Sequence, residues 1–266
     1  MPFVTANGIK FFYQQLGHGP DVVMIAGLGA DHTTWITTAH KLSSRFRLTI
    51  FDNRGAGQSD SPSGPYTTVQ MAQDTLALMS ALEIERAHIV GHSLGAYIAQ
   101  HIAINAPERV DKLVLIGGKA YQDTLGKLRR ENSIALMKAG VDKRLRLENS
   151  MLWVFGEKFL SDTRNVNNYI QINQNNSHPQ SEAGYLGQAA ATLTHDTREQ
   201  LTKIAADTLV ITGQDDINTP LYHAELLVEK IPRAQLQIIA DCGHIPQLEQ
   251  PRALQQLLQD FLLKKE

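Results

Sequence analysis

The segment Ile89-Val90-Gly91-His92-Ser93-Leu94-Gly95-Ala96 constrains the fold of this chain more than any other part of it. An apolar run over residues 88–90 leads directly into Gly-x-Ser-x-Gly, and apolar residues at helical spacing follow at once. A serine on such a tight strand-to-helix turn needs glycine two residues before and after it, because Cβ atoms there would collide with neighbouring backbone. The free N–H groups of the helix point at the serine, where they could stabilise an oxyanion. The segment predicts a nucleophile elbow with Ser93 as the nucleophile.

The whole chain has the composition of a single globular protein. It has 266 residues, 42% of them hydrophobic and 20% charged, which suits one domain with a sizeable core. Its net charge of −2 provides no basic footprint for nucleic acid. Its one cysteine, Cys242, excludes an internal disulfide and agrees with a reducing compartment. Residues 1–8 lack the order of a signal peptide, and no apolar run approaches the ~20 residues that span a bilayer. We therefore expect a cytoplasmic protein.

The remaining hydrophobic pattern alternates between strands and helices. Asn7-Gly8 joins two strand-like runs, which is a strong hairpin signal. We expect strands at residues 3–6, 9–13, 22–26, 48–51, 88–90, 113–116, 208–212 and 236–239. We expect helices around Trp35 to Leu42, over 69–82, behind Ser93, over 223–231 and from Pro251 onward. This alternation predicts an α/β protein with a mostly parallel sheet covered by helices on both faces, with ligands bound beyond the carboxyl ends of the strands.

Residues 119–207 interrupt this pattern. Strand-like runs stop, and Arg, Lys, Asn and Gln become frequent. We interpret residues 119–207 as a helical lid over a core formed by residues 1–118 and 208–266, and we expect a mobile connection within Asn165 to Pro179. Six basic residues fall in this lid and suggest either a solvated helix surface or a docking face for an acidic carrier protein: Lys127, Arg129, Arg130, Lys143, Arg144 and Arg146.

Two downstream strands end in residues that could activate Ser93. One is followed by Gly213-Gln214-Asp215-Asp216 and the other by Cys242-Gly243-His244. Because a free serine hydroxyl is a poor nucleophile, it needs a base and an orienting acid. We assign His244 as the base and Asp216 as the acid. Asp215 remains an alternative acid, both aspartates could be turn formers, and His244 could be structural. Cys242 and His244 lack the further ligands of a metal site, so we expect no metal.

A tetrahedral intermediate would need two N–H donors. We assign the backbone N–H of Leu94, directly after the nucleophile, and that of Leu28, in the loop after the strand at 22–26. Gly27 and Gly29 flank Leu28 and could let this loop approach a substrate, although a plain glycine turn is the alternative.

A charged, glycine-rich segment, Asp52-Asn53-Arg54-Gly55-Ala56-Gly57-Gln58-Ser59, ends another strand. It could contact substrate, but we interpret it as a structural turn, with Asp52 and Arg54 pairing to hold neighbouring loops.

Taken together, the motifs around Ser93, Asp216, His244 and Asp52 to Ser59 resemble those of the α/β-hydrolase superfamily. Further matching segments are Gly213-x-x-Asp216-x-x-x-Pro220 and Gly243-His244-x-Pro246-x-x-Glu249-x-Pro251. The resemblance implies an eight-stranded sheet with a helical lid. Within this superfamily, the chain resembles small esterases and lactonases such as the 3-oxoadipate enol-lactonases and the pimeloyl-carrier methyl esterases. The chain departs from them in carrying Ala26-Gly27 where the family usually has His-Gly.

These features predict a cofactor-independent serine hydrolase that cleaves a small carboxylic ester or lactone through an acyl-enzyme. The expected substrate pocket includes His92, Trp153, Phe155 and Ile245, and the substrate could be free or linked to an acyl carrier. A carbon–carbon bond hydrolase with the same triad, an acyltransferase, a cofactor-free haloperoxidase and a non-catalytic receptor remain alternatives. The sequence contains no information on oligomeric state.

Overall fold

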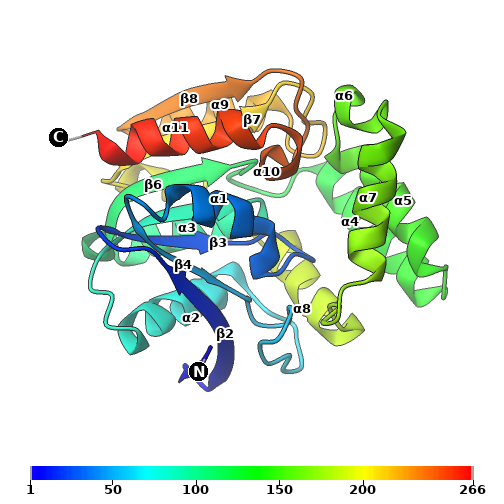
Figure 1. Ribbon diagram of the computed structural model, residues 1–266, viewed down its shortest axis with the longest axis horizontal. Coiled ribbons are helices and arrows are strands. Elements are labelled where there is room, and N and C mark those ends of the chain that lie inside the picture. Colours follow the sequence, from blue (N-terminus) through cyan, green and yellow to red (C-terminus); the bar gives the residue numbers. More distant parts are fainter. Residues whose placement is uncertain (1, 265–266) are drawn as a thin grey trace.

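The computed structural model describes residues 2–264, and its centre is an eight-stranded sheet (Figure 1). The order across the sheet is β1-β2-β4-β3-β5-β6-β7-β8. β1 and β2 are antiparallel, β2 is antiparallel to β4, and every pair from β4 to β8 is parallel. The strands are β1 (Phe3–Ala6), β2 (Ile9–Leu16), β3 (Asp21–Ile25), β4 (Arg47–Phe51), β5 (Ala87–His92), β6 (Val110–Ile116), β7 (Asp207–Gly213) and β8 (Ala234–Ile239). The mostly parallel α/β sheet expected from the sequence is confirmed.

The hairpin between β1 and β2 turns at Asn7-Gly8. Both residues have positive φ, 48° and 72°, which a two-residue turn of this kind requires and which asparagine and glycine tolerate. β2 extends beyond the expected Tyr13 to Leu16, because its second half pairs with β4 through Leu16 and Leu48.

Helices cover both faces of the sheet. The buried strands alternate their side chains between two hydrophobic clusters: Val22 and Met24 of β3 face one, and Val23 and Ile25 face the other. The first face is covered by α1 and α11, and the second by α2, α3 and α9. These helices are α1 (Ile36–Leu42), α2 (Thr68–Ala81), α3 (Leu94–Asn105), α9 (Leu221–Lys230) and α11 (Pro251–Leu263). Short helical turns lie at η1 (His32–Trp35), η2 (Pro107–Arg109), η3 (Leu201–Lys203) and α10 (Pro246–Glu249).

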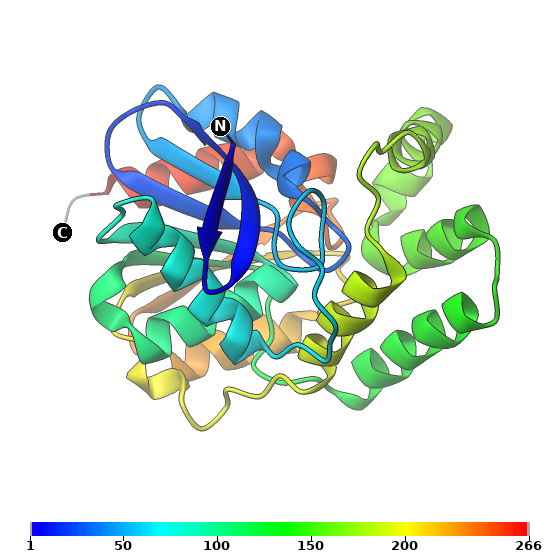
Figure 2. The same cartoon turned by 90° about the horizontal axis from the view of Figure 1, so that it is seen from below.

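Five further helices lie between β6 and β7, at the carboxyl ends of the parallel strands (Figures 1 and 2). They are α4 (Thr124–Lys138), α5 (Lys143–Val154), α6 (Glu157–Leu160), α7 (Thr163–Gln174) and α8 (Glu182–Leu193). We call this helical segment the lid. Its two ends leave the core side by side: Tyr121 and Asp196 form an isolated antiparallel bridge, and the Thr197 N–H donates to the Ala120 carbonyl at 2.7 Å.

The polar stretch Asn165 to Pro179 is more regular than its composition indicates. Most of it forms α7, which Asp162 caps by accepting a hydrogen bond from the Arg164 N–H, and its Ile170 is buried. The connection expected within this stretch is confined to the residues after Gln174, where α7 ends, and its mobility stays a prediction.

Within the described residues, no helix has the length and apolar character that crossing a bilayer would require.

Candidate active site

Ser93 occupies a strained turn between β5 and α3. Its backbone has φ 54° and ψ −117°, outside the regions that L-residues prefer, and its N–H is held by the Ile116 carbonyl of the neighbouring strand at 2.8 Å. A Cβ on Gly91 would lie 2.2 Å from the Gly95 carbonyl oxygen, and one on Gly95 would lie 2.2 Å from the Ile25 carbonyl oxygen. Only glycine fits at either position, so the turn has the geometry of a nucleophile elbow.

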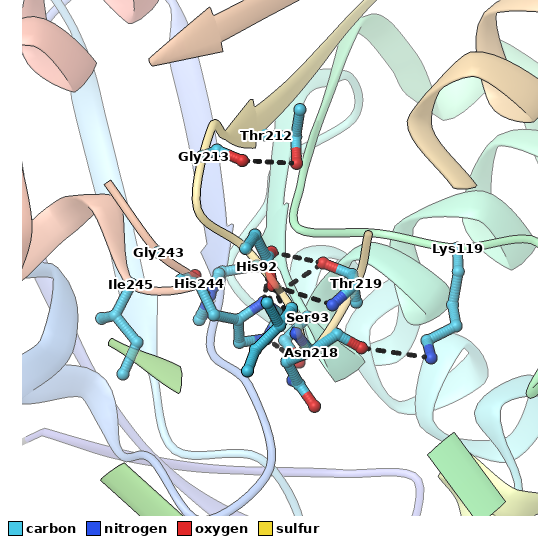
Figure 3. A network of polar contacts seen from close by, with 12 residues as sticks. His92, Ser93, Lys119, Thr212, Gly213, Asn218, Thr219, Gly243, His244 and Ile245 are labelled. Carbon is cyan, nitrogen blue, oxygen red and sulfur yellow. Dashed lines mark hydrogen bonds and ion pairs between the residues drawn. The ribbon is translucent and has the colours of Figure 1, made fainter. Parts of the chain in front are cut away.

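The side chains of Ser93, His244 and Asp216 form a continuous hydrogen-bonded chain. Figure 3 shows Ser93 and His244 close together at this site. His244 Nε2 lies 2.9 Å from Ser93 Oγ, and His244 Nδ1 lies 2.8 Å from Asp216 Oδ2. Asp216 and His244 are buried, whereas Ser93 keeps part of its surface exposed. The adjacent Asp215 is exposed, and its N–H donates to the Cys242 carbonyl at 2.8 Å. Of the two acids, Asp216 is the one that the structure places against His244.

The loop after β7 keeps Asp216 ionised. Its Oδ1 accepts hydrogen bonds from the N–H groups of Asn218 and Thr219, and its Oδ2 accepts one from Thr219 Oγ1 at 2.5 Å. Burial alone would raise the pKa of Asp216, but the nearby His244 and the Thr219 hydrogen bonds hold that pKa below its usual value. A carboxylate so fixed can orient an imidazole and stabilise an imidazolium.

His92 supports the loop of residues 240–245, which carries His244 and is called the His244 loop below. Its Nε2 donates to the His244 backbone carbonyl at 2.8 Å, which fixes the neutral tautomer, and its ring lies against the His244 ring at 5.0 Å. Burial lowers the pKa of His92 to about 3, so the ring stays uncharged. The sequence placed His92 in a substrate pocket. The structure leaves His92 only 5% exposed and directs its Nε2 at the His244 carbonyl, and a pocket role for His92 stays a prediction.

Glu249 joins the same loop to the lid. Its Oε2 accepts the N–H groups of Gly243 and Gly156, each at 2.8 Å, and its Oε1 accepts the Ile245 N–H at 2.9 Å. Gly156 belongs to the lid. A second link comes from the His244 N–H, which donates to the Val154 carbonyl at the end of α5, also at 2.8 Å. The backbone of the His244 loop is therefore bound directly to the lid.

The two expected oxyanion donors are free to bind a ligand. Among residues 2–264, neither the Leu28 N–H nor the Leu94 N–H donates a hydrogen bond. Leu94 is the first residue of α3, so its N–H belongs to the unsatisfied group at a helix N-terminus. The loop of Leu28 is held by the lid, because the fully buried Gln188 of α8 accepts the Gly29 N–H at 3.4 Å.

The other expected pocket residues occupy different environments. Phe155 is buried inside the lid, stacked on Phe159 at 4.0 Å and edge-on to Tyr169 at 4.8 Å, so it packs the lid rather than a pocket. Ile245 is half-buried and packs against the same cluster. Trp153 is half-buried under the Arg129 guanidinium, 4.6 Å from its ring centre.

The segment from Asp52 to Ser59 is structural, although not through the expected ion pair. Asp52 accepts hydrogen bonds from the His32 ring and backbone N–H, at 2.8 and 2.7 Å, and Arg54 pairs with Asp74 of α2. The expected Asp52–Arg54 pair is therefore wrong, because each side chain turns toward a different buried partner.

The six basic lid residues differ in their exposure to solvent. Lys127, Lys143 and Arg144 are exposed, whereas Arg129, Arg130 and Arg146 are half-buried.

The chain belongs to the alpha/beta hydrolase fold family, whose model matches residues 20–251. Among its relatives, a Caulobacter protein (strain K31) named putative carbamate hydrolase RutD is 31% identical over 97% of both chains. A Mycobacterium tuberculosis protein named putative non-heme bromoperoxidase BpoC is 32% identical over 95% of this chain and 97% of its own. A solved structure of the enol-lactonase from Burkholderia xenovorans LB400 superposes with a TM-score of 0.88 at 26% identity, covering 99% of this chain and all (100%) of the other. The protein is thus an α/β-hydrolase.

Sequence reasoning did not foresee the roles of Thr219, Gln188 and Glu249 in the site. Glu249 was part of a matching motif, but a motif does not show which backbone groups a carboxylate will bind. Gln188 lies in a helix far along the chain from Gly29, and no local pattern connects the two.

Proposed function

We propose that the protein is a serine hydrolase of small carboxylic esters or lactones, with Ser93, His244 and Asp216 as its catalytic triad. The observation that carries this proposal is the unbroken chain from a partly exposed serine on a strained elbow, through a buried histidine, to a buried, fully hydrogen-bonded aspartate.

In the proposed reaction, Ser93 Oγ attacks the substrate carbonyl carbon while His244 Nε2 accepts its proton. The negative charge on the carbonyl oxygen is stabilised by the N–H groups of Leu28 and Leu94; removing one such donor typically costs roughly a hundredfold to a thousandfold in rate. His244 then gives its proton to the leaving alcohol, and an acyl-enzyme forms on Ser93. Water, deprotonated by His244, attacks this ester and releases the acid. Asp216 holds the imidazole and stabilises its charged form throughout.

A carbamate is a second candidate substrate, because a relative that is 31% identical over 97% of both chains carries the name carbamate hydrolase. A carbamate ester also presents an electrophilic carbonyl carbon to the serine: loss of its alcohol would leave a carbamoyl group on Ser93, and hydrolysis of that group would release a carbamic acid.

The proposal is tested by hydrolysis of p-nitrophenyl esters of increasing acyl length and of a p-nitrophenyl carbamate. We expect multiple turnover by the wild type, loss of turnover in Ser93→Ala, and no loss in Ser177→Ala, which changes an exposed serine in the loop after α7. Folded wild-type protein without turnover on any of these substrates, or a Ser93→Ala variant as active as the wild type, would refute the proposal.

A further inference from the structure

An ion pair with a buried lysine lies where the chain enters the lid. Lys119 follows β6 and is only 2% exposed, and its ammonium group lies 3.3 Å from Asp123 Oδ1. The same oxygen accepts the Gly126 N–H at 2.9 Å and so caps α4. Burial lowers the pKa of Lys119, and the charge of Asp123 opposes that change. The carboxylate therefore offsets part of the penalty of burying the ammonium group.

Lys119 also contacts the loop that carries the triad acid. This loop joins β7 to α9, and we call its residues 214–220 the acid loop. Lys119 Nζ donates a hydrogen bond to the Asn218 carbonyl at 3.5 Å, as Figure 3 shows. The Asn218 N–H in turn donates to Asp216 Oδ1 at 2.9 Å. A single residue, Asn218, thus connects the buried ammonium group to the catalytic carboxylate.

Asp123 holds the end of the acid loop. Its Oδ2 accepts a hydrogen bond from the Tyr222 hydroxyl at 2.5 Å and lies 3.3 Å from His223 Nε2. Tyr222 and His223 belong to the first turn of α9, directly after the acid loop. Between these contacts, Arg129 of α4 donates to the Ile217 carbonyl. The residues after Asp216 are therefore bound at several points to the segment that starts the lid.

The backbone of Lys119 is itself fixed to the helix that begins at the nucleophile. Its carbonyl accepts a hydrogen bond from Gln100 Nε2 of α3 at 3.1 Å, and it lies 3.1 Å from His195 Nε2 at the other end of the lid. Gln100 is fully buried and lies about two helical turns after Ser93. Lys119 thus connects the elbow helix to the acid loop.

We propose that Lys119 and Asp123 are positioning residues for the triad acid, which hold the acid loop so that Asp216 stays within hydrogen-bond distance of His244. This inference rests on the proposed serine hydrolase function and assigns two further residues to that site. Gln214, Asp215 and Ile217 of the acid loop are exposed, so apolar burial does little to fix this loop. The hydrogen bonds to its backbone and to α9 then set its place.

The test begins with Lys119→Met, which removes the ammonium group and keeps a long, unbranched side chain. On p-nitrophenyl acetate, at a temperature where the variant is folded, we expect kcat to fall about tenfold to a hundredfold, because a catalytic group displaced by about 1 Å can cost that much. KM should change little, since the lysine acts on the acid loop. Asp123→Asn keeps an oxygen that can cap α4 but removes the counter-ion, and it should lower kcat in the same direction. It also provides the second probe if Lys119→Met does not fold.

Lys112 provides a matched control at the opposite end of β6. It is 6% exposed, and its ammonium group donates to the carbonyls of Phe261, at 2.8 Å, and Lys264, at the end of α11. It is therefore a second buried lysine that binds backbone carbonyls, but these carbonyls do not belong to the acid loop. Lys112→Met should lower Tm and leave kcat as it is in the wild type.

A double-mutant cycle tests whether Lys119 acts through Asp216. In an Asp216→Asn background, adding Lys119→Met should lower kcat by less than about twofold, because the carboxylate to be positioned is already absent. A residue that supports only the fold would lower kcat by the same factor in both backgrounds.

The outcomes separate this inference from the function on which it rests. Wild-type kcat in both Lys119→Met and Asp123→Asn would overturn the positioning role and leave the hydrolase intact. An equal loss of kcat with and without the Asp216 carboxylate, or an equal loss in Lys112→Met, would do the same. Absence of Ser93-dependent hydrolysis in the wild type would overturn the hydrolase and the positioning role together.

Discussion

Replacing Glu249 by alanine should weaken both the fold and the catalytic step. The wild-type carboxylate accepts hydrogen bonds from three backbone N–H groups, two in the His244 loop and one in the lid. Burial raises the pKa of Glu249, and its three N–H partners oppose that rise. Without the carboxylate, each N–H loses its acceptor.

The size of the effect follows from these three bonds. An unsatisfied buried donor costs about 1–3 kcal/mol, and because Glu249 is only half-buried, water can reach the gap, so we take about 1 kcal/mol for each. The total of about 3 kcal/mol corresponds to a fall in Tm of about 6–12 °C for a chain of this size. The loop that carries His244 should also loosen. A displacement of a catalytic group by about 1 Å can cost on the order of a hundredfold, so we expect kcat to fall about tenfold to a hundredfold with little change in KM.

The assay combines thermal unfolding with steady-state hydrolysis of p-nitrophenyl acetate at a temperature where the variant is folded. Glu249→Gln should show a smaller loss, because its amide oxygen still accepts hydrogen bonds while its NH₂ group faces a backbone donor. Glu157→Gln, an exposed change on α6, serves as the matched control. A Glu249→Ala variant that loses stability yet keeps the wild-type kcat would refute the reasoning, since the carboxylate would then support the fold without positioning His244.

Three further predictions test other parts of the site. Asp216→Asn should keep the geometry yet lower kcat by about 10⁴-fold, because the amide no longer selects the required His244 tautomer or stabilises its charge; a loss below tenfold in steady-state assays would contradict this. Gly95→Ala places a Cβ 2.2 Å from the Ile25 carbonyl oxygen, so urea unfolding should show a loss of about 1–3 kcal/mol. Burial lowers the pKa of His101 to about 4, so at this site the unfolded chain binds more protons between pH 6.5 and 4, and His101 should contribute up to roughly 3 kcal/mol to the fall in the free energy of unfolding as the pH drops through that window, in addition to the contribution of His92. His101→Gln should remove this contribution and reduce the slope, and an unchanged slope would argue against it.

The sheet and the elbow could be predicted because their signals are local. Continuous apolar runs such as Val22 to Ala26 indicate strands that are buried on both faces, and two glycines around Ser93 leave the chain little choice of turn. The juxtaposition of Ser93, Asp216 and His244 also follows, since all three come after parallel strands and the ends of those strands share one edge of the sheet.

The parts that could not be predicted depend on long-range choices between equivalent partners. Arg54 pairs with Asp74 and not with Asp52, because the position of α2 brings Asp74 to it, and sequence spacing does not show this position. Likewise, nothing in the neighbourhood of His92 shows that its ring faces the His244 carbonyl, and nothing near Phe155 shows that it packs against Tyr169 inside the lid. These side-chain contacts form only when the helices and loops pack against one another in the folded protein.

The two ends of the lid lie side by side where they join the core, and this affects how far the length of the lid can change. Tyr121 and Asp196 form a β-bridge, so the residues between them form a long loop whose two ends are held together at the core. The entropic penalty of closing a loop grows only with the logarithm of its length, by about 0.6 kcal/mol for each doubling. Helices can therefore be inserted into or deleted from this loop at little thermodynamic penalty to the sheet. The lid is thus free to accumulate change while the sheet beneath it continues to hold Ser93 in the same place.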